Sequence, residues 1–110
     1  EERQFLYAED CCEALETIMN RYTDFKPEDP LHITSFRSNT IREVANIIQG
    51  CFQLEGIYDV NIKSGLAKDS VQLDKRNAPD TYILDWWIPK TGIDVGIRKV
   101  FDEMKKNYGY

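Results

Sequence analysis

Apolar side chains recur at helical spacing in three stretches of the chain. In residues 10–22 they fall at i, i+3, i+4, i+7, i+8 and i+11, at Cys11, Ala14, Leu15, Ile18, Met19 and Tyr22. That spacing is typical of one buried face of an α-helix. Asp10 is the expected N-cap, and Glu13, three residues later, completes a capping box. The pattern predicts an amphipathic helix over residues 10–22.

Two further helices follow the same logic. The second begins after Thr40, which forms a capping box with Glu43, and Gly56 provides a stop. Its expected buried face consists of Ile41, Val44, Ala45, Ile48, Cys51 and Phe52. The third helix is expected over residues 92–107, with Thr91 and Asp94 as its capping pair. Its apolar face consists of Ile93, Ile97, Val100, Phe101 and Met104.

Two short segments have the pattern of strands. Residues 31–34, with sequence LHIT, are a short strand candidate, and residues 60–63 alternate between apolar and polar side chains. Because the second helix lies between them, we expect a βαβ unit with parallel strands and a right-handed crossover. Residues 23–30 and 64–79 are expected to be loops. The prediction is a small α/β fold of one domain over residues 1–110, with a βαβ unit and three amphipathic helices.

Charge and cysteine content narrow the function classes. The formal net charge is −5 and the basic residues are scattered, which argues against binding to nucleic acid or to a membrane surface. No apolar run approaches the roughly 20 residues of a membrane span. The three cysteines, Cys11, Cys12 and Cys51, fit neither a disulfide framework nor a metal motif. We expect reduced, buried thiols in a cytoplasmic protein.

The chain offers few candidate groups for catalysis. His32 is the single histidine and has no partner at metal-ligand spacing, so we expect no metal site and a strand histidine satisfied by a neighbour. The glycines match no phosphate-binding loop. Tyr22 and Lys26 match a Tyr-x-x-x-Lys pair, but Pro27 biases Lys26 out of a helix, so we interpret the match as coincidental. No catalytic residue is therefore expected in this chain.

Three landmarks in order resemble a known family. Residues 3–10, with sequence RQFLYAED, resemble the Arg-x-aromatic-aliphatic-Tyr/His-Val-x-Asp motif of the extended short-chain dehydrogenase/reductases, which include nucleotide-sugar epimerases and dehydratases. Residues 31–35 and 40–45 look like a strand of that family and the helix after it. Residues 76–80 and 87–89 resemble its Arg-x-x-Asp segment and its Trp-x-Pro turn. The resemblance implies the C-terminal, substrate-binding part of a Rossmann-type epimerase/dehydratase.

The resemblance also implies roles for four residues. Arg3 and Arg76 would clamp the diphosphate of a nucleotide sugar, a task suited to the rigid fork of guanidinium donors. Phe5 would pack near the nucleotide. Asp80 would accept a hydrogen bond from a ribose hydroxyl or brace an arginine. In the family the catalytic Tyr-x-x-x-Lys and the loop for NAD or NADP lie upstream, so this chain is expected to bind neither cofactor and to be inactive alone.

The expected partners follow from the same resemblance. An N-terminal Rossmann lobe or a second copy of the chain would cover the apolar faces, and we expect a dimer or a larger species. An alternative is a stand-alone, non-enzymatic α/β binding or protein-interaction module derived from that family. A third is an α/β protein-interaction domain whose resemblance to the family is accidental.

Overall fold

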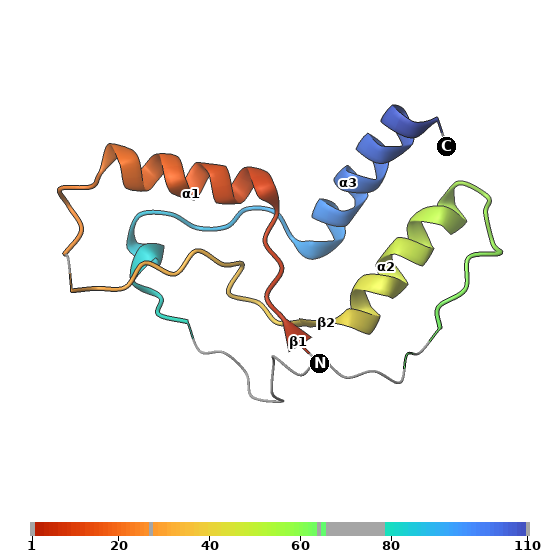
Figure 1. Ribbon diagram of the computed structural model, residues 1–110, viewed down its shortest axis with the longest axis horizontal. Coiled ribbons are helices and arrows are strands. Elements are labelled where there is room, and N and C mark those ends of the chain that lie inside the picture. Colours follow the sequence, from red (N-terminus) through yellow and green to blue (C-terminus); the bar gives the residue numbers. More distant parts are fainter. Residues whose placement is uncertain (1, 27, 64, 66–78, 110) are drawn as a thin grey trace.

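Three helices dominate the computed structural model, which describes residues 2–26, 28–63, 65 and 79–109. They confirm the three helices that the apolar periodicity predicts, and each begins within two residues of its predicted start. Short elements accompany them, namely two strands of two residues and one turn of 3₁₀ helix (Figure 1). In chain order the elements are β1 (Glu2–Arg3), α1 (Ala8–Asn20), β2 (Asn39–Thr40), α2 (Ile41–Leu54), η1 (Tyr82–Asp85) and α3 (Ile93–Tyr108).

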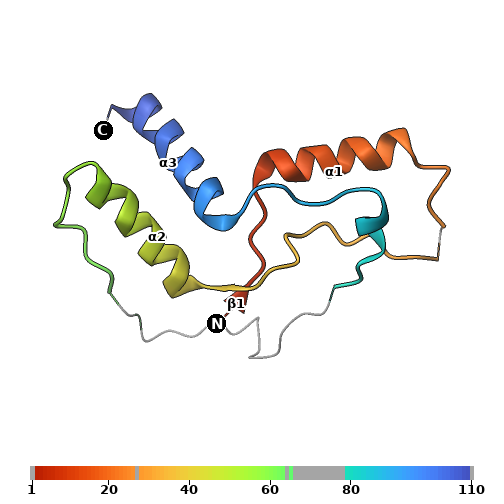
Figure 2. The same cartoon turned by 180° about the vertical axis from the view of Figure 1, so that it is seen from behind.

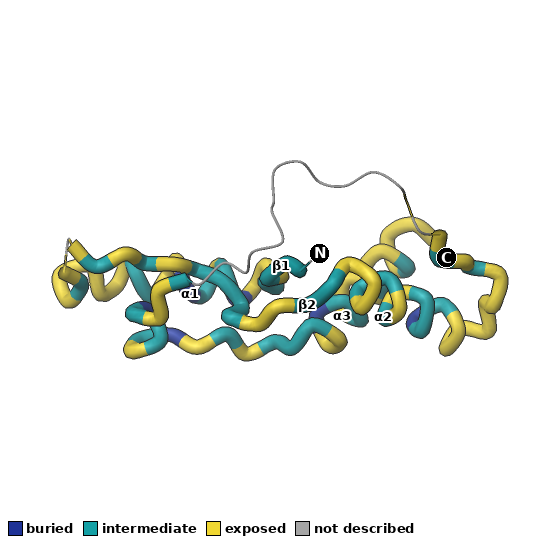
Figure 3. Tube along the Cα trace, turned by 90° about the horizontal axis from the view of Figure 1, so that it is seen from below, coloured by how far each residue is buried: buried dark blue, intermediate teal, exposed yellow. Residues whose placement is uncertain are grey.

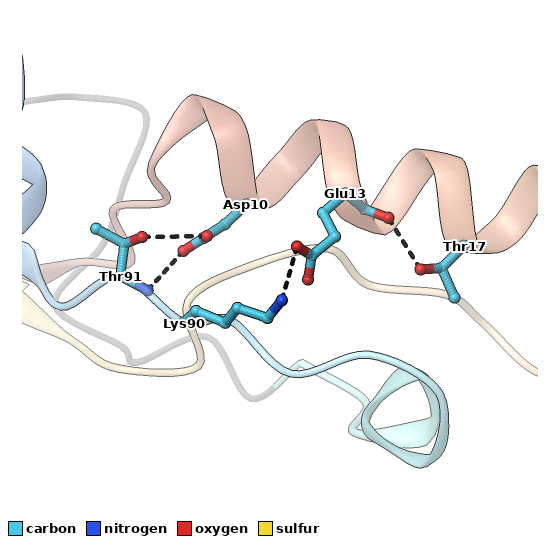
Figure 4. A network of polar contacts seen from close by, with 5 residues as sticks. All are labelled: Asp10, Glu13, Thr17, Lys90 and Thr91. Carbon is cyan, nitrogen blue, oxygen red and sulfur yellow. Dashed lines mark hydrogen bonds and ion pairs between the residues drawn. The ribbon is translucent and has the colours of Figure 1, made fainter.

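The first helix begins at Ala8, so the prediction of Asp10 as its N-cap is wrong. Tyr7 occupies the N-cap position without a side-chain hydrogen bond, and Asp10 lies in the first turn. The Asp10 carboxylate accepts from the backbone N–H of Thr91 at 2.8 Å and from its hydroxyl at 3.1 Å (Figure 4). This side chain is 5% exposed. Asp10 therefore joins α1 to the segment before α3 instead of capping its own helix.

The same contact explains why the N-cap of α3 differs from the predicted one. The Thr91 hydroxyl donates to Asp10, so the predicted capping pair of Thr91 with Asp94 is wrong, and Gly92 is the N-cap. Lys90 adds an ion pair to α1, with its Nζ 2.9 Å from the Glu13 carboxylate (Figure 4). Two consecutive residues before α3 thus bond to the first turns of α1.

The capping box of α2 is confirmed. The Thr40 hydroxyl accepts from the backbone N–H of Glu43 at 3.0 Å, and Asn39 donates to the Glu43 carboxylate at 2.8 Å. The hydrogen bond from Asn39 holds the pKa of Glu43 below its usual value. Beyond the helix, Gly56 has φ of +80°, a left-handed conformation that favours glycine.

The predicted βαβ unit is wrong. Neither residues 31–34 nor residues 60–63 form a strand. Within the described residues, the sheet consists of β1 and β2 in antiparallel register, with Glu2 opposite Thr40 and Arg3 opposite Asn39. A strand requires a neighbour to complete its hydrogen-bond ladder, and the described segments supply none to either candidate. The described residues form a small α/β domain without a parallel sheet. Of the predicted loop at residues 64–79, residues 64 and 66–78 lie outside the described residues.

The buried core lies between α1, the segment at residues 31–36 and η1. Ala14, Ile83 and Trp87 form its centre. The partly buried side chains that pack around it are Leu6, Ile18, Leu31, Ile33 and Phe36. Trp87 thus lies in the core, three residues before Lys90, the first of the two residues that bond to α1.

The helices are spread along a flat molecule. α2 and α3 lie side by side at one end, and α1 lies at the other (Figures 1 and 2). The extents are 52 × 34 × 18 Å, and the radius of gyration is 17.0 Å. A compact domain of 100 residues has a radius of about 13 Å. Seen edge-on, few positions of the thin plate are buried (Figure 3).

Much of the predicted apolar surface is therefore uncovered. On α1, Leu15 is 49% exposed and Met19 is 73% exposed, so only part of the expected stripe meets the core. The expectation of buried thiols holds for Cys51, whereas Cys11 is half-buried and Cys12 is exposed. The apolar periodicity predicted the helices correctly, but it did not show which faces the chain covers by itself.

The bond between Asp10 and Thr91 leads to a stability prediction. Asp10→Ala should lower the free energy of unfolding by about 2–3 kcal/mol, because two hydrogen bonds to a buried charge are lost and their donors stay unmatched. Asp10→Asn should retain part of that stability, since its amide oxygen can still accept from the Thr91 N–H. Urea unfolding monitored by circular dichroism measures the difference. Glu9→Ala, at the exposed neighbouring position, is the control, and an equal loss in both alanine variants would contradict the assignment.

Candidate functional site

The first arginine of the expected diphosphate site is held by the short sheet. Pairing of β1 with β2 places Arg3 opposite Asn39, two residues before α2 begins. Arg3 is half-buried, and its Nη1 donates to the Glu2 carbonyl at 3.1 Å. The adjacent Gln4 side chain accepts from the Thr34 hydroxyl. Arg3 therefore lies beside the end of the segment at residues 31–34.

The expected ribose-binding residue is connected to the same segment. The backbone N–H of Asp80 donates to Nδ1 of His32 at 2.9 Å, while the Asp80 side chain is exposed. His32 is thus satisfied by a neighbour, as predicted, although it does not lie in a strand. His32 and Thr34 are two positions apart. The segment at residues 31–34 therefore connects Asp80, through His32, to Gln4, through Thr34.

The second arginine of the clamp, Arg76, lies outside the described residues. The pairing of Arg3 with Arg76 therefore stays a prediction. Residues 31–34, which the sequence predicts as a strand, form none. The end of that segment is nevertheless where Thr34 bonds to Gln4, next to Arg3.

Phe5 belongs to a different surface feature, an apolar groove between α2 and α3. The groove has a volume of about 470 Å³. Its lining includes Phe5, Ile48, Phe52, Ile97, Phe101 and Met104. Phe52 and Phe101 meet edge to face, with ring centroids 5.0 Å apart. Sequence periodicity predicted the two apolar faces, but the groove itself depends on how the helices are placed.

A close approach holds α3 against the residues before α1. Gly96 is buried, and a Cβ atom at this position would lie 3.3 Å from Cδ1 of Tyr7. The Lys99 Nζ lies 5.4 Å from the centroid of the same Tyr7 ring. This packing keeps Tyr7, which lines the groove, in contact with α3.

An ionic cluster holds the far ends of α2 and α3 together. The Glu55 carboxylate lies 2.8 Å from Nζ of Lys105 and 3.2 Å from Nη2 of Arg98. Arg98 also pairs with Asp102 at 3.1 Å. The hydrogen bond from Lys105 keeps the pKa of Glu55 below its ordinary value of 4.5, against the opposing effect of desolvation. The cluster is a structural clamp across the two walls of the groove.

The part of the chain that the structure describes holds no group of three or more His, Cys, Asp or Glu side chains placed to bind a metal ion. None of its helices has both the length and the apolar character needed to cross a bilayer. α1 ends at Asn20, so Tyr22 and Lys26 do not share a helical face.

The chain is similar to one curated enzyme over most of its length. It is 25% identical to the GDP-L-fucose synthase of Sinorhizobium fredii over 107 residues, which cover 96% of this chain. The chain spans 31% of that enzyme's length. No family model matches the chain, and no solved structure matches it.

The ionic cluster predicts a loss of stability in acid. Because the folded state lowers the pKa of Glu55, its contribution is fully present above pH 4.5 and is lost as pH falls through the lower, folded value. Unfolding free energies measured between pH 3 and pH 7 should fall more steeply below about pH 4.5 in the wild type than in Glu55→Gln. Glu16→Gln, at an exposed site on α1, is the control. Identical pH profiles for the wild type and Glu55→Gln would contradict this role.

Proposed function

We propose that this chain is the nucleotide-sugar-binding, C-terminal part of an NAD(P)-dependent sugar epimerase/dehydratase, with residues 1–110 acting as one lobe. The observation that carries the proposal is the match of 96% of the chain to about a third of GDP-L-fucose synthase. The landmark sequences at residues 3–10, 31–45 and 76–89 support it, because they follow the order found in that family. A cytoplasmic location is part of the proposal.

The proposed ligand site lies around the segment at residues 31–34. Arg3 lies next to Gln4, which bonds to Thr34, and Asp80 bonds to His32. Arg76 is only four positions before Asp80 in sequence. In this proposal the two guanidinium groups bind the diphosphate and Asp80 accepts from the ribose. Phe5, two residues after Arg3, packs beside the nucleotide.

Catalysis requires a second lobe in this proposal. Hydride chemistry needs a held cofactor and a positioned acid or base, and we assign neither to this chain. A Rossmann lobe would supply both. The thin, open shape and the uncovered stripe of α1 support a partner surface, because exposed apolar faces of this kind occur at interfaces.

A stand-alone binding or interaction module is the second candidate. The apolar groove between α2 and α3 favours it, because concave apolar surfaces bind partner helices and small molecules. The two candidates differ in their ligand. The first requires binding of a nucleotide sugar at the arginines, whereas the second does not.

Binding of nucleotide sugars tests the arginine site. Titration calorimetry with GDP-, UDP- and dTDP-sugars should detect binding of at least one of them. Arg76→Ala or Arg3→Ala should weaken that binding by about 1.5–3 kcal/mol, since a charge-assisted contact to phosphate is lost. Arg76→Lys should recover only part of it, because an ammonium group cannot present paired donors.

The matched control for these variants is Arg21→Ala, which removes an exposed arginine that pairs with Asp24. Its affinity should equal that of the wild type. Equal affinity in Arg3→Ala, Arg76→Ala and Arg21→Ala would contradict the diphosphate clamp. Absence of binding by every nucleotide sugar would favour the interaction module.

The cofactor prediction is tested separately. The isolated chain should bind neither NAD nor NADP and should convert no nucleotide sugar, because the cofactor loop and the acid/base pair are expected in the other lobe. Calorimetry and an absorbance assay for reduced cofactor measure the two properties. Stoichiometric binding of NAD or NADP would contradict the assignment of these roles to a second lobe.

A further inference from the structure

The first helix, α1, carries apolar side chains on its outward side as well as on its inward side. Its exposed residues form an outer face that consists of Ala8, Glu9, Cys12, Leu15, Glu16, Met19 and Asn20. α1 follows one long edge of the molecule, and no other described segment lies over this face (Figures 1 and 2). The outward side of a surface helix is usually polar, so the outer face of α1 indicates an interface.

The apolar residues of the outer face have the spacing of a coiled-coil seam. Ala8, Cys12, Leu15 and Met19 are separated by four, three and four positions. This is the alternation of a and d positions in a heptad repeat, against which a partner helix packs its own apolar side chains. α1 has 13 residues, so the seam extends over about 20 Å. The occupant that fits this face is therefore a helix.

The charges beside the seam are acidic. Glu9 and Glu16 flank it on one side, and α1 contains no basic residue. Within the described residues, neither carboxylate forms an ion pair or a side-chain hydrogen bond. Both occupy positions next to the seam at which coiled coils form salt bridges between helices. A partner helix with lysine or arginine beside its apolar seam would complement them.

A second copy of α1 does not supply this complement. In an antiparallel pair, the glutamates of one helix would face the glutamates of the other. In a parallel pair, they would face Cys11 and Ile18 on the opposite flank of the seam, which are uncharged and half-buried. Neither arrangement brings a base to the glutamates, so the outer face favours a basic partner over another copy of the chain.

We propose that the outer face of α1 docks a helix of a separate partner protein, and that this helix has an apolar heptad seam flanked by lysine or arginine. The partner covers the apolar seam and forms ion pairs with Glu9 and Glu16. The remaining acids of α1, Asp10 and Glu13, take no part because they already bind the segment before α3. The proposal does not depend on nucleotide-sugar binding.

Two synthetic peptides of three heptads test the docking with the 110-residue chain. Both have leucine at the a and d positions, and they differ at e and g, where one has lysine and the other has glutamate. Fluorescence anisotropy should show about tenfold or tighter binding of the lysine peptide, because it alone complements the acidic flank. Glu16→Lys should reverse this preference. Glu28→Lys, the same charge change at an exposed residue outside α1, should preserve it.

The two methionines of the chain locate the binding surface. Met19→Ser should weaken binding of the lysine peptide about tenfold, because an apolar side chain of the seam is lost. Met104→Ser makes the same change in the groove between α2 and α3 and should leave the affinity unchanged. Circular dichroism should show the same helix content in both variants and in the wild type.

Three results would overturn the proposal. Equal binding of the two peptides would show that the acidic flank does not choose the partner. Weaker binding in Met104→Ser but not in Met19→Ser would assign the peptide to the groove. Failure of both peptides to bind would leave the outer face of α1 to the second lobe, or to a second copy if ultracentrifugation shows a dimer that Met19→Ser disrupts.

Discussion

The buried carboxylate of Asp10 connects parts of the chain that are otherwise joined by few contacts. It accepts two hydrogen bonds from Thr91, 81 positions away, and so fixes the start of α3 relative to α1. The core of Ala14, Ile83 and Trp87 lies on one side of this bond. The α2–α3 pair and its groove lie on the other side. The placement of the groove relative to the core therefore depends on the Asp10 carboxylate and its partners, together with the packing of Gly96 against Tyr7.

Local sequence information was sufficient where a feature depends on nearby residues. The capping box of Thr40 and Glu43 spans three positions, and the structure confirms it. The predicted caps at Asp10 and Thr91 satisfied the same local pattern. In the structure these two residues hydrogen-bond to each other instead of capping their own helices. Such competition cannot be seen in a window of four residues, because both outcomes satisfy the polar groups of the same side chains.

The strand predictions were wrong for a related reason. Residues 31–34 and 60–63 have the composition of strands, but a strand also needs a neighbouring chain to complete its hydrogen bonds. Helices depend on neighbours in the same way, because an apolar face stays exposed where no other segment covers it. The apolar stripe of α1 and the exposed apolar residues of α3 are examples. For the candidate site, sequence resemblance named Arg3, Phe5, Arg76 and Asp80. The structure adds the His32–Thr34 segment that links Asp80 to the neighbour of Arg3, and it shows that Phe5 also lines the groove.

The central claim is that the diphosphate of a nucleotide sugar binds beside residues 31–34 and not against the walls of the groove formed by α2 and α3. Amide chemical shifts recorded by NMR during titration with GDP-, UDP- and dTDP-sugars test it directly. The account predicts that shifts will concentrate at Arg3, Thr34, Arg76 and Asp80, while Ile48 and Met104 in the groove stay unchanged. Shifts confined to the groove, or no shifts with any nucleotide sugar, would contradict it.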